Sequence, residues 1–363
     1  MNADSKSVMI YKRPIYWLLL LVPVSIWLEV SHASPVPIFI VSCLAILPLA
    51  ALMGEATEHL AHYAGPGLGG LLNATFGNAA ELIIGFIALR EGEIEIVKAS
   101  LTGSILGNLL MVLGLAMLVG GWKHKELTFN RLAAETGSGM MVLAVVSLVI
   151  PAIYAQVTHH QNPGHIEALS FDISFVLIAT YIASLLFQFR THQRLFAPDG
   201  GSAAHHGPRG EVWPVSRSLI TLVAAAATVG LVSEFLVGAV DAAGTSLGIG
   251  KVFMGVVVIA VIGNAAEHST AVLVAHKGQM DLAFGIAMGS AMQIALFVAP
   301  TLVIAGHLIG QPLSLEFTIL EVSAVMLSVI AVSNLVLDGK TNWFEGVQLL
   351  AIYTVLAMTF YFM

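Results

Sequence analysis

The chain has 363 residues, of which 57% are apolar and only 10% are charged, and its mean hydropathy is +0.89. A soluble domain carries about 25% charged residues, so this composition excludes a water-facing surface and predicts helices that cross a lipid bilayer. The net charge is −7 without a basic stripe, so no nucleic-acid partner is expected, and the single cysteine, Cys43, excludes an intrachain disulfide.

A bilayer core needs helices of about 20 apolar residues, and hydropathy predicts eleven spans along this chain. Most are apolar on every side, which is typical of membrane spans and not of a soluble bundle. We expect the first helix to be retained, although Ser31-His32-Ala33 resembles a weak signal-peptidase site. The predicted spans cover residues 15–30, 37–54, 68–89, 97–119, 137–153, 171–189, 218–239, 251–276, 281–304, 317–336 and 343–360.

The Lys and Arg residues between the spans predict the orientation, because cytoplasmic loops carry an excess of them. With eleven spans and a cytoplasmic N-terminus, 12 of the 15 Lys and Arg residues lie inside, and only Arg90, Lys98 and Lys251 lie outside. The C-terminus is then expected outside the membrane.

A repeated pentapeptide is the most informative pattern in the sequence. GNAAE stands at residues 77–81 and again at 263–267, which is 186 positions later (263 − 77). The register continues without a gap, and an odd number of spans separates the copies, so they cross the membrane in opposite directions. The further matching pairs are Gly92 with Gly278, Glu95 with Asp281, Gly103-Ser104 with Gly289-Ser290, and Gly120 with Gly306.

This repeat predicts an all-α membrane protein of two inverted five-helix halves, with an ion site near the midplane where the halves meet. Residues 1–36 form an extra N-terminal helix, 37–189 the first half and 218–363 the second half. The polar segment 190–217 reads as a cytoplasmic linker, and we expect its His205-His206 pair to be solvated.

Glu81 and Glu267 lie within apolar spans at matching positions of the repeat. Carboxylates are costly there and usually line an ion or proton path. A single buried glutamate could simply hydrogen-bond to a neighbouring helix, but a symmetric pair favours an ion site. The sequence therefore predicts that both carboxylates bind the transported cation.

Amide and hydroxyl side chains on the same spans supply further oxygens. Hard cations such as Ca²⁺ bind roughly six to eight oxygens, whereas no thiolate or imidazole dominates here, which argues against zinc or copper. We expect no cofactor, with Ca²⁺ as transported substrate. For Asn108 and Gln293, direct ligation of the cation and ordinary interhelical hydrogen bonding are both open. The candidates are Asn78, Asn264, Ser104, Asn108, Ser290 and Gln293.

His268 and Glu58 are candidates for carrying an additional proton. His268 follows Glu267, and adjacent helix residues point about 100° apart, so a proton relay and a plain hydrogen bond are both open. The run 58–62 lacks the HExxH order of metalloproteases, so no enzyme is expected. Gly77 and Gly263 either break their helices or let them pack closely.

At these residues the chain resembles the calcium/proton exchangers of the calcium/cation antiporter superfamily. The resemblance rests on GNAAELIIG at 77–85 and GNAAEH at 263–268, and extends to 54–81 and 289–300. It implies eleven spans, two inverted halves, and a central site built on the glutamate of each motif. Eukaryotic relatives often carry an acidic segment between the halves, whereas 190–217 is basic here, which indicates a bacterial inner-membrane protein.

The expected mechanism is antiport of Ca²⁺ against protons by alternating access. Calcium binds when both glutamates are ionised, and protonation on the other side of the membrane expels it. Sodium-driven antiport, or antiport of K⁺, Na⁺ or Mn²⁺, is the main alternative on the same fold. A channel or a non-transporting receptor is less favoured, because neither explains a matched pair of glutamates. The oligomeric state stays open.

Overall fold

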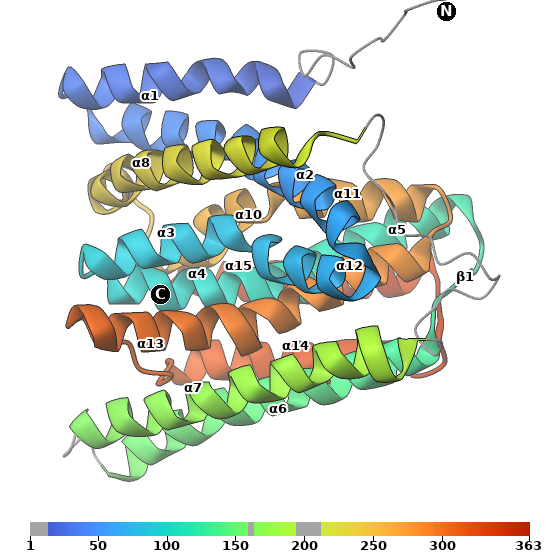
Figure 1. Cartoon of the computed structure of the whole chain (residues 1–363). Coiled ribbons are helices and arrows are strands. Elements are labelled where there is room, and N and C mark those ends of the chain that lie inside the picture. The colour runs from blue at the N-terminus through green and yellow to red at the C-terminus, as the bar shows by residue number, and fades with distance from the viewer. Residues whose placement is uncertain (1–13, 159–162, 194–211) are drawn as a thin grey trace, which may run out of the picture.

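The computed structural model describes residues 14–158, 163–193 and 212–363, apart from the side chains of residues 66–68, 70, 71 and 74. The first 13 residues and most of the expected linker 190–217, including His205-His206, lie outside the described residues. The chain is mostly helical, and the helices run roughly alongside one another in one bundle (Figure 1).

The first half of the chain forms a long kinked helix, a shorter helix, a long helical segment interrupted by a π-helical turn, and a helical hairpin. Here η2 is a 3-10 helix, whereas η3 and η4 are π-helices. The elements are η2 (Pro14–Leu20), α1 (Leu21–Val30), α2 (Pro35–Phe76), α3 (Ala79–Arg90), α4 (Ile94–Leu106), η3 (Gly107–Val112), α5 (Leu113–Lys123), β1 (Leu127–Thr128), α6 (Arg131–Val157), α7 (Pro163–Leu186) and η4 (Phe187–Thr191).

The second half follows a similar plan. Two of its long helical segments again contain a π-helical turn, η6 and η7. The elements are α8 (Val215–Leu247), α9 (Lys251–Phe253), η6 (Met254–Ile259), α10 (Ala260–Gly263), α11 (Ala265–His276), α12 (Met280–Gln293), η7 (Ile294–Val298), α13 (Ala299–Ile309), α14 (Ile319–Leu335), β2 (Lys340–Thr341) and α15 (Trp343–Tyr361).

Seven helices of the described part are long and apolar enough to cross a membrane, or eight if the bent pair Lys251–Gly263 and Ala265–His276 forms one span. Pro14–Val30 and Ile319–Leu335 are shorter apolar helices. The second expected span, 37–54, lies within a longer apolar helix, Pro35–Gly65. α2 continues as helix to Phe76, kinked at Gly65, whose φ of 75° is a conformation that glycine adopts readily.

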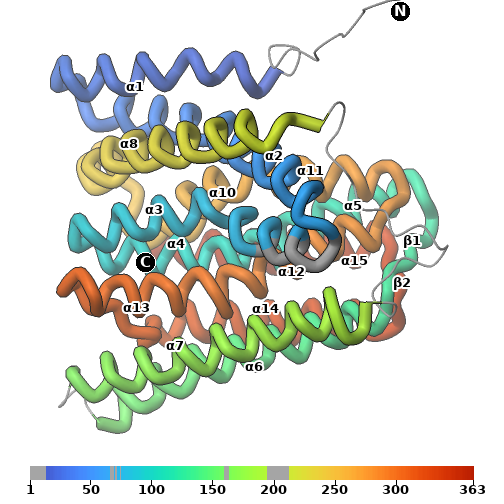
Figure 2. The backbone as a smooth tube through the Cα atoms, in the orientation of Figure 1, coloured from blue at the N-terminus to red at the C-terminus, as the bar shows by residue number. Residues whose placement is uncertain are grey.

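The segments that begin at α4 and α12 form the centre of the bundle. The apolar stretch of Ile94–Lys123 is 78% buried inside the protein, whereas that of Pro163–Thr191 is 28% buried. α6 and α7 lie along one edge, and α1 and α8 lie along the opposite edge (Figures 1 and 2). The outer helices therefore present apolar faces to lipid, and the polar residues of the spans gather between the central helices.

A short antiparallel ladder joins the two halves at one end of the bundle. β1 pairs with β2, so that Leu127 lies opposite Thr341. Asn130 caps the following helix α6 by accepting a hydrogen bond from Ala133, and Asn342 caps α15 in the same way. Each cap accepts a hydrogen bond from backbone N–H groups at the start of a helix, which have no acceptor within the helix itself.

Candidate cation-binding site

The two copies of the repeated motif lie at two helix breaks. α2 ends at Phe76 and α3 begins at Ala79, while α10 ends at Gly263 and α11 begins at Ala265 with a bend of 61°. The asparagine at each break, Asn78 or Asn264, leaves helical geometry without capping the next helix through its side chain. The two amide side chains are therefore free to reach across to other helices.

Each glutamate lies in the first turn of the helix that follows its break, Glu81 in α3 and Glu267 in α11. Each carboxylate also lies against the glycine of the other motif. A Cβ built on Gly263 would be 3.4 Å from Glu81 Oε1, and a Cβ built on Gly77 would be 3.6 Å from Glu267 Oε1. This crossed arrangement brings both carboxylates into one small region, where the positive ends of two helix dipoles favour negative charge.

Asn264 belongs to a buried network of hydrogen bonds between three helical segments. Its Nδ2 donates to Ser104 Oγ at 2.9 Å, and its Oδ1 accepts from Asn108 Nδ2 at 3.2 Å. Asn108 Nδ2 also donates to Ser290 Oγ at 3.0 Å. These contacts fix the side chains beside Glu267.

Asn78 is joined to the same network from the other motif. Its Oδ1 accepts from Ser290 Oγ at 3.0 Å, and its Nδ2 donates to Gln293 Oε1. The six amide and hydroxyl residues that the sequence singled out are thus brought together between α4, η3 and α12. Their role as cation ligands stays a prediction.

Three buried oxygen atoms of this region accept no hydrogen bond from any described residue: Glu81 Oε2, Glu267 Oε2 and Asn108 Oδ1. A buried acceptor without a donor costs about 1–3 kcal/mol, so three together need a compensating partner. Within the described residues, no group of three or more His, Cys, Asp or Glu side chains could hold a metal ion. The oxygens present therefore suit a hard cation held by two carboxylates and neutral oxygens.

Three π-helical segments lie next to these residues. η3 begins at Gly107, directly before Asn108, and η7 begins directly after Gln293, while η6 leads into α10. Asn108 Nδ2 also donates to the Ser104 carbonyl oxygen, one turn earlier, at 2.9 Å. Such π-helical turns are found frequently at functional sites.

The two candidates for an additional proton lie in different surroundings. His268 is partly buried next to Glu267, and its Nε2 has no hydrogen-bond partner among the described residues. Glu58 has an exposed side chain on α2. Of the two candidates, His268 is the more buried and the one adjacent to Glu267 in sequence.

A second buried polar cluster was missed by the sequence reasoning. Glu321 is 4% exposed and accepts hydrogen bonds from the backbone and hydroxyl of Thr318 at 3.0 and 2.8 Å, and from Thr102 Oγ1 at 3.3 Å. Lys98 Nζ donates nearby to Ser314 Oγ at 3.1 Å. A threonine three residues before a glutamate is a capping-box signal that could have revealed this cluster.

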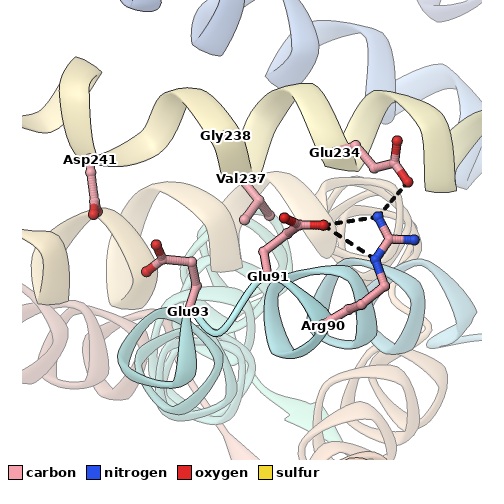
Figure 3. Close-up of a pocket in the computed structure, with 7 residues that line it drawn as sticks. All are labelled: Arg90, Glu91, Glu93, Glu234, Val237, Gly238 and Asp241. Atoms are coloured by element: carbon pink, nitrogen blue, oxygen red, sulfur yellow. Dashed lines mark hydrogen bonds and ion pairs between the residues drawn. The ribbon is translucent and has the colours of Figure 1, made fainter. Parts of the chain in front are cut away.

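Charged residues also surround a surface pocket of about 380 Å³ at the end of α3 (Figure 3). Arg90 Nη2 lies 2.7 Å from Glu234 Oε1 on α8 and 2.9 Å from Glu91 Oε1. Glu93 and Asp241 also line this pocket. These exposed ion pairs connect α3 and α8 but lie outside the network around Glu81 and Glu267.

Comparison with known proteins places the chain among cation exchangers. The family model described as sodium/calcium exchanger protein matches residues 34–190 and 217–362. A Ca(2+)/H(+) antiporter of Aphanothece halophytica is 45% identical, with 98% of this chain and 98% of the relative covered. The Ca(2+)/H(+) antiporter ChaA of Bacillus subtilis is 44% identical, with 94% and 96% covered.

Solved structures have the same fold. The structure of native YfkE matches with a TM-score of 0.83 and 38% identity, and covers 96% of this chain and 100% of that one. The crystal structure of the H+/Ca2+ exchanger CAX matches with a TM-score of 0.71 over 96% and 91% of the two chains. The identity to the second is 14%, so it supports the fold alone.

Proposed function

We infer that this chain, which belongs to the sodium/calcium exchanger protein family and within it to the calcium/proton exchangers, moves Ca²⁺ across a membrane in exchange for protons. The observation that carries the inference is the crossed pair of carboxylates, each with a buried oxygen that lacks a donor among the described residues. The names of the similar antiporters support the same ions.

Charge balance explains how such a pair can exchange the two ions. Two ionised glutamates neutralise one Ca²⁺, so a divalent ion is tolerated away from water. Nearby carboxylates repel each other, which favours protonation once the cation leaves. Two protons then replace one Ca²⁺ without a net charge. A third proton, with His268 as its candidate carrier, would move one charge, worth about 2.3 kcal/mol per 100 mV.

We further propose that the chain has eleven spans in two inverted halves, 37–189 and 218–363, with the extra helix 1–36 and the linker 190–217. Supporting this, α3 and α11 extend from the site toward opposite ends of the bundle (Figure 1), and Gly92 and Gly278, matched in the repeat, share a φ of 80°. Alternating access would then expose the site to each side in turn. The Lys and Arg counts support an N-terminus in the cytoplasm and a C-terminus outside.

Single substitutions of the glutamates test the site. Glu81→Gln and Glu267→Gln keep the shape of each side chain and remove its charge, so each should abolish calcium flux into proteoliposomes under an imposed pH gradient. The purified variants should also lose calcium binding in titration calorimetry, while their thermal unfolding stays close to that of the unchanged protein. Transport at the original rate by either variant would show that the two-carboxylate mechanism is wrong.

The same assay separates the alternatives. Sodium as driving ion needs further oxygens beside the carboxylates, and the positions between each Asn and Glu are alanines: Ala79, Ala80, Ala265 and Ala266. This favours protons. Flux that requires sodium and ignores the pH gradient would establish the sodium-driven alternative. Flux that neither saturates nor follows the pH gradient would indicate a channel.

A further inference from the structure

A second pocket, of about 450 Å³, lies where α5 and α11 end, near the β1–β2 ladder (Figure 2). We call it the α5 pocket, and it is lined by Leu118, Val119, Trp122 and Lys123 of α5 and by His276 of α11. The four α5 residues form two pairs one helical turn apart, so they share one side of the helix. None of the lining residues belongs to the hydrogen-bond network of the candidate cation site. The pocket is therefore a separate feature with a mostly apolar wall.

The α5 pocket lies at the level where two apolar segments end. Lys123 is the last residue of a candidate span, and His276 is the last residue of the bent helix pair. Trp122 is 77% exposed and packs edge-on against Trp343 of α15, with ring centroids 5.9 Å apart. Exposed indole rings at the ends of spans are typical of the boundary between hydrocarbon and lipid headgroups. The pocket therefore faces the headgroup region of the bilayer.

Two lysines beside the α5 pocket have no carboxylate partner among the described residues. Lys123 lines the pocket and Lys277 directly follows its lining residue on α11, and both are exposed. The segments that carry them are in contact, because a Cβ built on Gly278 would be 3.4 Å from the ring of His124. Two unpaired ammonium groups therefore lie at one edge of an apolar pocket.

This combination fits the chemistry of an anionic phospholipid. An acyl chain fills an apolar pocket, and each methylene group buried there contributes about fourfold in affinity. A lysine near an anionic lipid contributes about fivefold, and basic pockets between membrane helices bind anionic headgroups in this way. A soluble phosphate would use the lysines without the apolar wall, whereas a zwitterionic lipid would use the apolar wall without the lysines.

We propose that the α5 pocket binds one anionic phospholipid of the surrounding membrane, with an acyl chain against its apolar wall and the phosphate beside Lys123 and Lys277. The proposal concerns lipid binding and stands apart from the ion exchange proposed above. A basic residue in a last helical turn also interacts with the helix dipole, and Lys123 ends α5. That role predicts lost stability with unchanged lipid binding, so the two roles are separable.

The experiment measures lipid binding to the purified full-length protein in detergent by native mass spectrometry. The probes are phosphatidylglycerol, phosphatidylcholine with identical acyl chains, and glycerol 3-phosphate. The first phosphatidylglycerol should bind about fivefold or more tightly than phosphatidylcholine, because it carries the negative charge that the lysines favour. Glycerol 3-phosphate should bind more than about tenfold less tightly than phosphatidylglycerol, because it has no acyl chain to bury.

Charge variants test the two lysines. Lys123→Gln and Lys277→Gln should each weaken phosphatidylglycerol binding by about fivefold and leave phosphatidylcholine binding unchanged. Lys123→Arg keeps the charge and should keep the affinity. Lys340→Gln is the matched control, since it removes the same charge at the same end of the bundle from a lysine that pairs with Glu126 Oε1 at 3.0 Å. It should bind phosphatidylglycerol like the unchanged protein.

Four outcomes would overturn the proposal. The first is equal affinity of the unchanged protein for the two lipids. The second is an equal loss in Lys340→Gln and Lys123→Gln, which would indicate general surface charge. The third is a lower unfolding temperature of Lys123→Gln with full lipid affinity, which would assign this lysine to the helix dipole. The fourth is an oligomer that the lysine variants lose while lipid binding stays unchanged, which would place a second copy of the chain in the pocket.

Discussion

At the scale of single residues, the chemistry depends on how closely two glutamates and two glycines approach. Glu81 and Glu267 lie against Gly263 and Gly77, and a Cβ at these glycines would come within 3.4 and 3.6 Å of the carboxylate oxygens. The glycine at the start of each GNAAE motif thus contacts the carboxylate of the other motif. Each motif therefore supplies one carboxylate of the candidate site and the glycine that lies beside the other carboxylate.

Gly263→Ala tests this role at one residue. The added Cβ would lie 3.4 Å from Glu81 Oε1, tighter than an ordinary contact, and would displace the carboxylate by a few tenths of an ångström. We expect calcium affinity to fall by about tenfold, which corresponds to about 1.4 kcal/mol. Titration calorimetry would measure it, with Gly139→Ala, an exposed position on α6 with no atom within 4 Å, as control. Equal affinities in the two variants would contradict the crossed arrangement.

At the scale of elements, α14 is anchored to α4 by buried polar groups. Thr318 caps α14, and the Glu321 carboxylate accepts both the backbone N–H and the hydroxyl of Thr318. Thr102 of α4 donates to the same carboxylate. Because α4 also carries Ser104 of the candidate site, this anchor holds one wall of the site in place.

Thr318→Ala should therefore destabilise the protein without removing transport. It deletes a helix cap, which costs about 0.5–2 kcal/mol, and takes one donor from a carboxylate that is 4% exposed. Thermal unfolding of the purified protein should shift to lower temperature, while the remaining folded protein keeps its calcium affinity. Thr354→Ala on the exposed face of α15, whose hydroxyl donates to the Leu350 carbonyl oxygen, is the control and should shift far less. An unchanged unfolding temperature in Thr318→Ala would argue against the anchor.

At the scale of the whole molecule, the proposed exchange predicts that protons and Ca²⁺ compete for the same pair of carboxylates. Calcium binds the ionised form, so its affinity should fall as the pH is lowered through the titration of the pair. Each proton released on binding contributes about tenfold in affinity per pH unit. Calorimetry in buffers of different ionisation enthalpy should detect proton release in the unchanged protein. An affinity independent of pH would contradict proton coupling at Glu81 and Glu267.

The sequence by itself determined the membrane class and the glutamate pair. These follow from local information: apolar runs long enough for a bilayer, and a pentapeptide that recurs in register. It also indicated that Gly77 and Gly263 could break their helices, because glycine weakens helices intrinsically. The packing of segments far apart in the chain is not encoded in any local pattern.

Only the tertiary structure decided how these parts meet. α2 runs through a kink at Gly65 to Phe76, whereas hydropathy predicted one span that ends at residue 54 and another that begins at residue 68. The network joins Asn78, Asn264 and Asn108 from three segments more than 20 residues apart in sequence, so its partners could not be assigned from spacing. The close contact of Gly103 with the Val256 backbone joins α4 to η6 across 153 positions of the chain (256 − 103), and no local pattern specifies a contact between such distant segments.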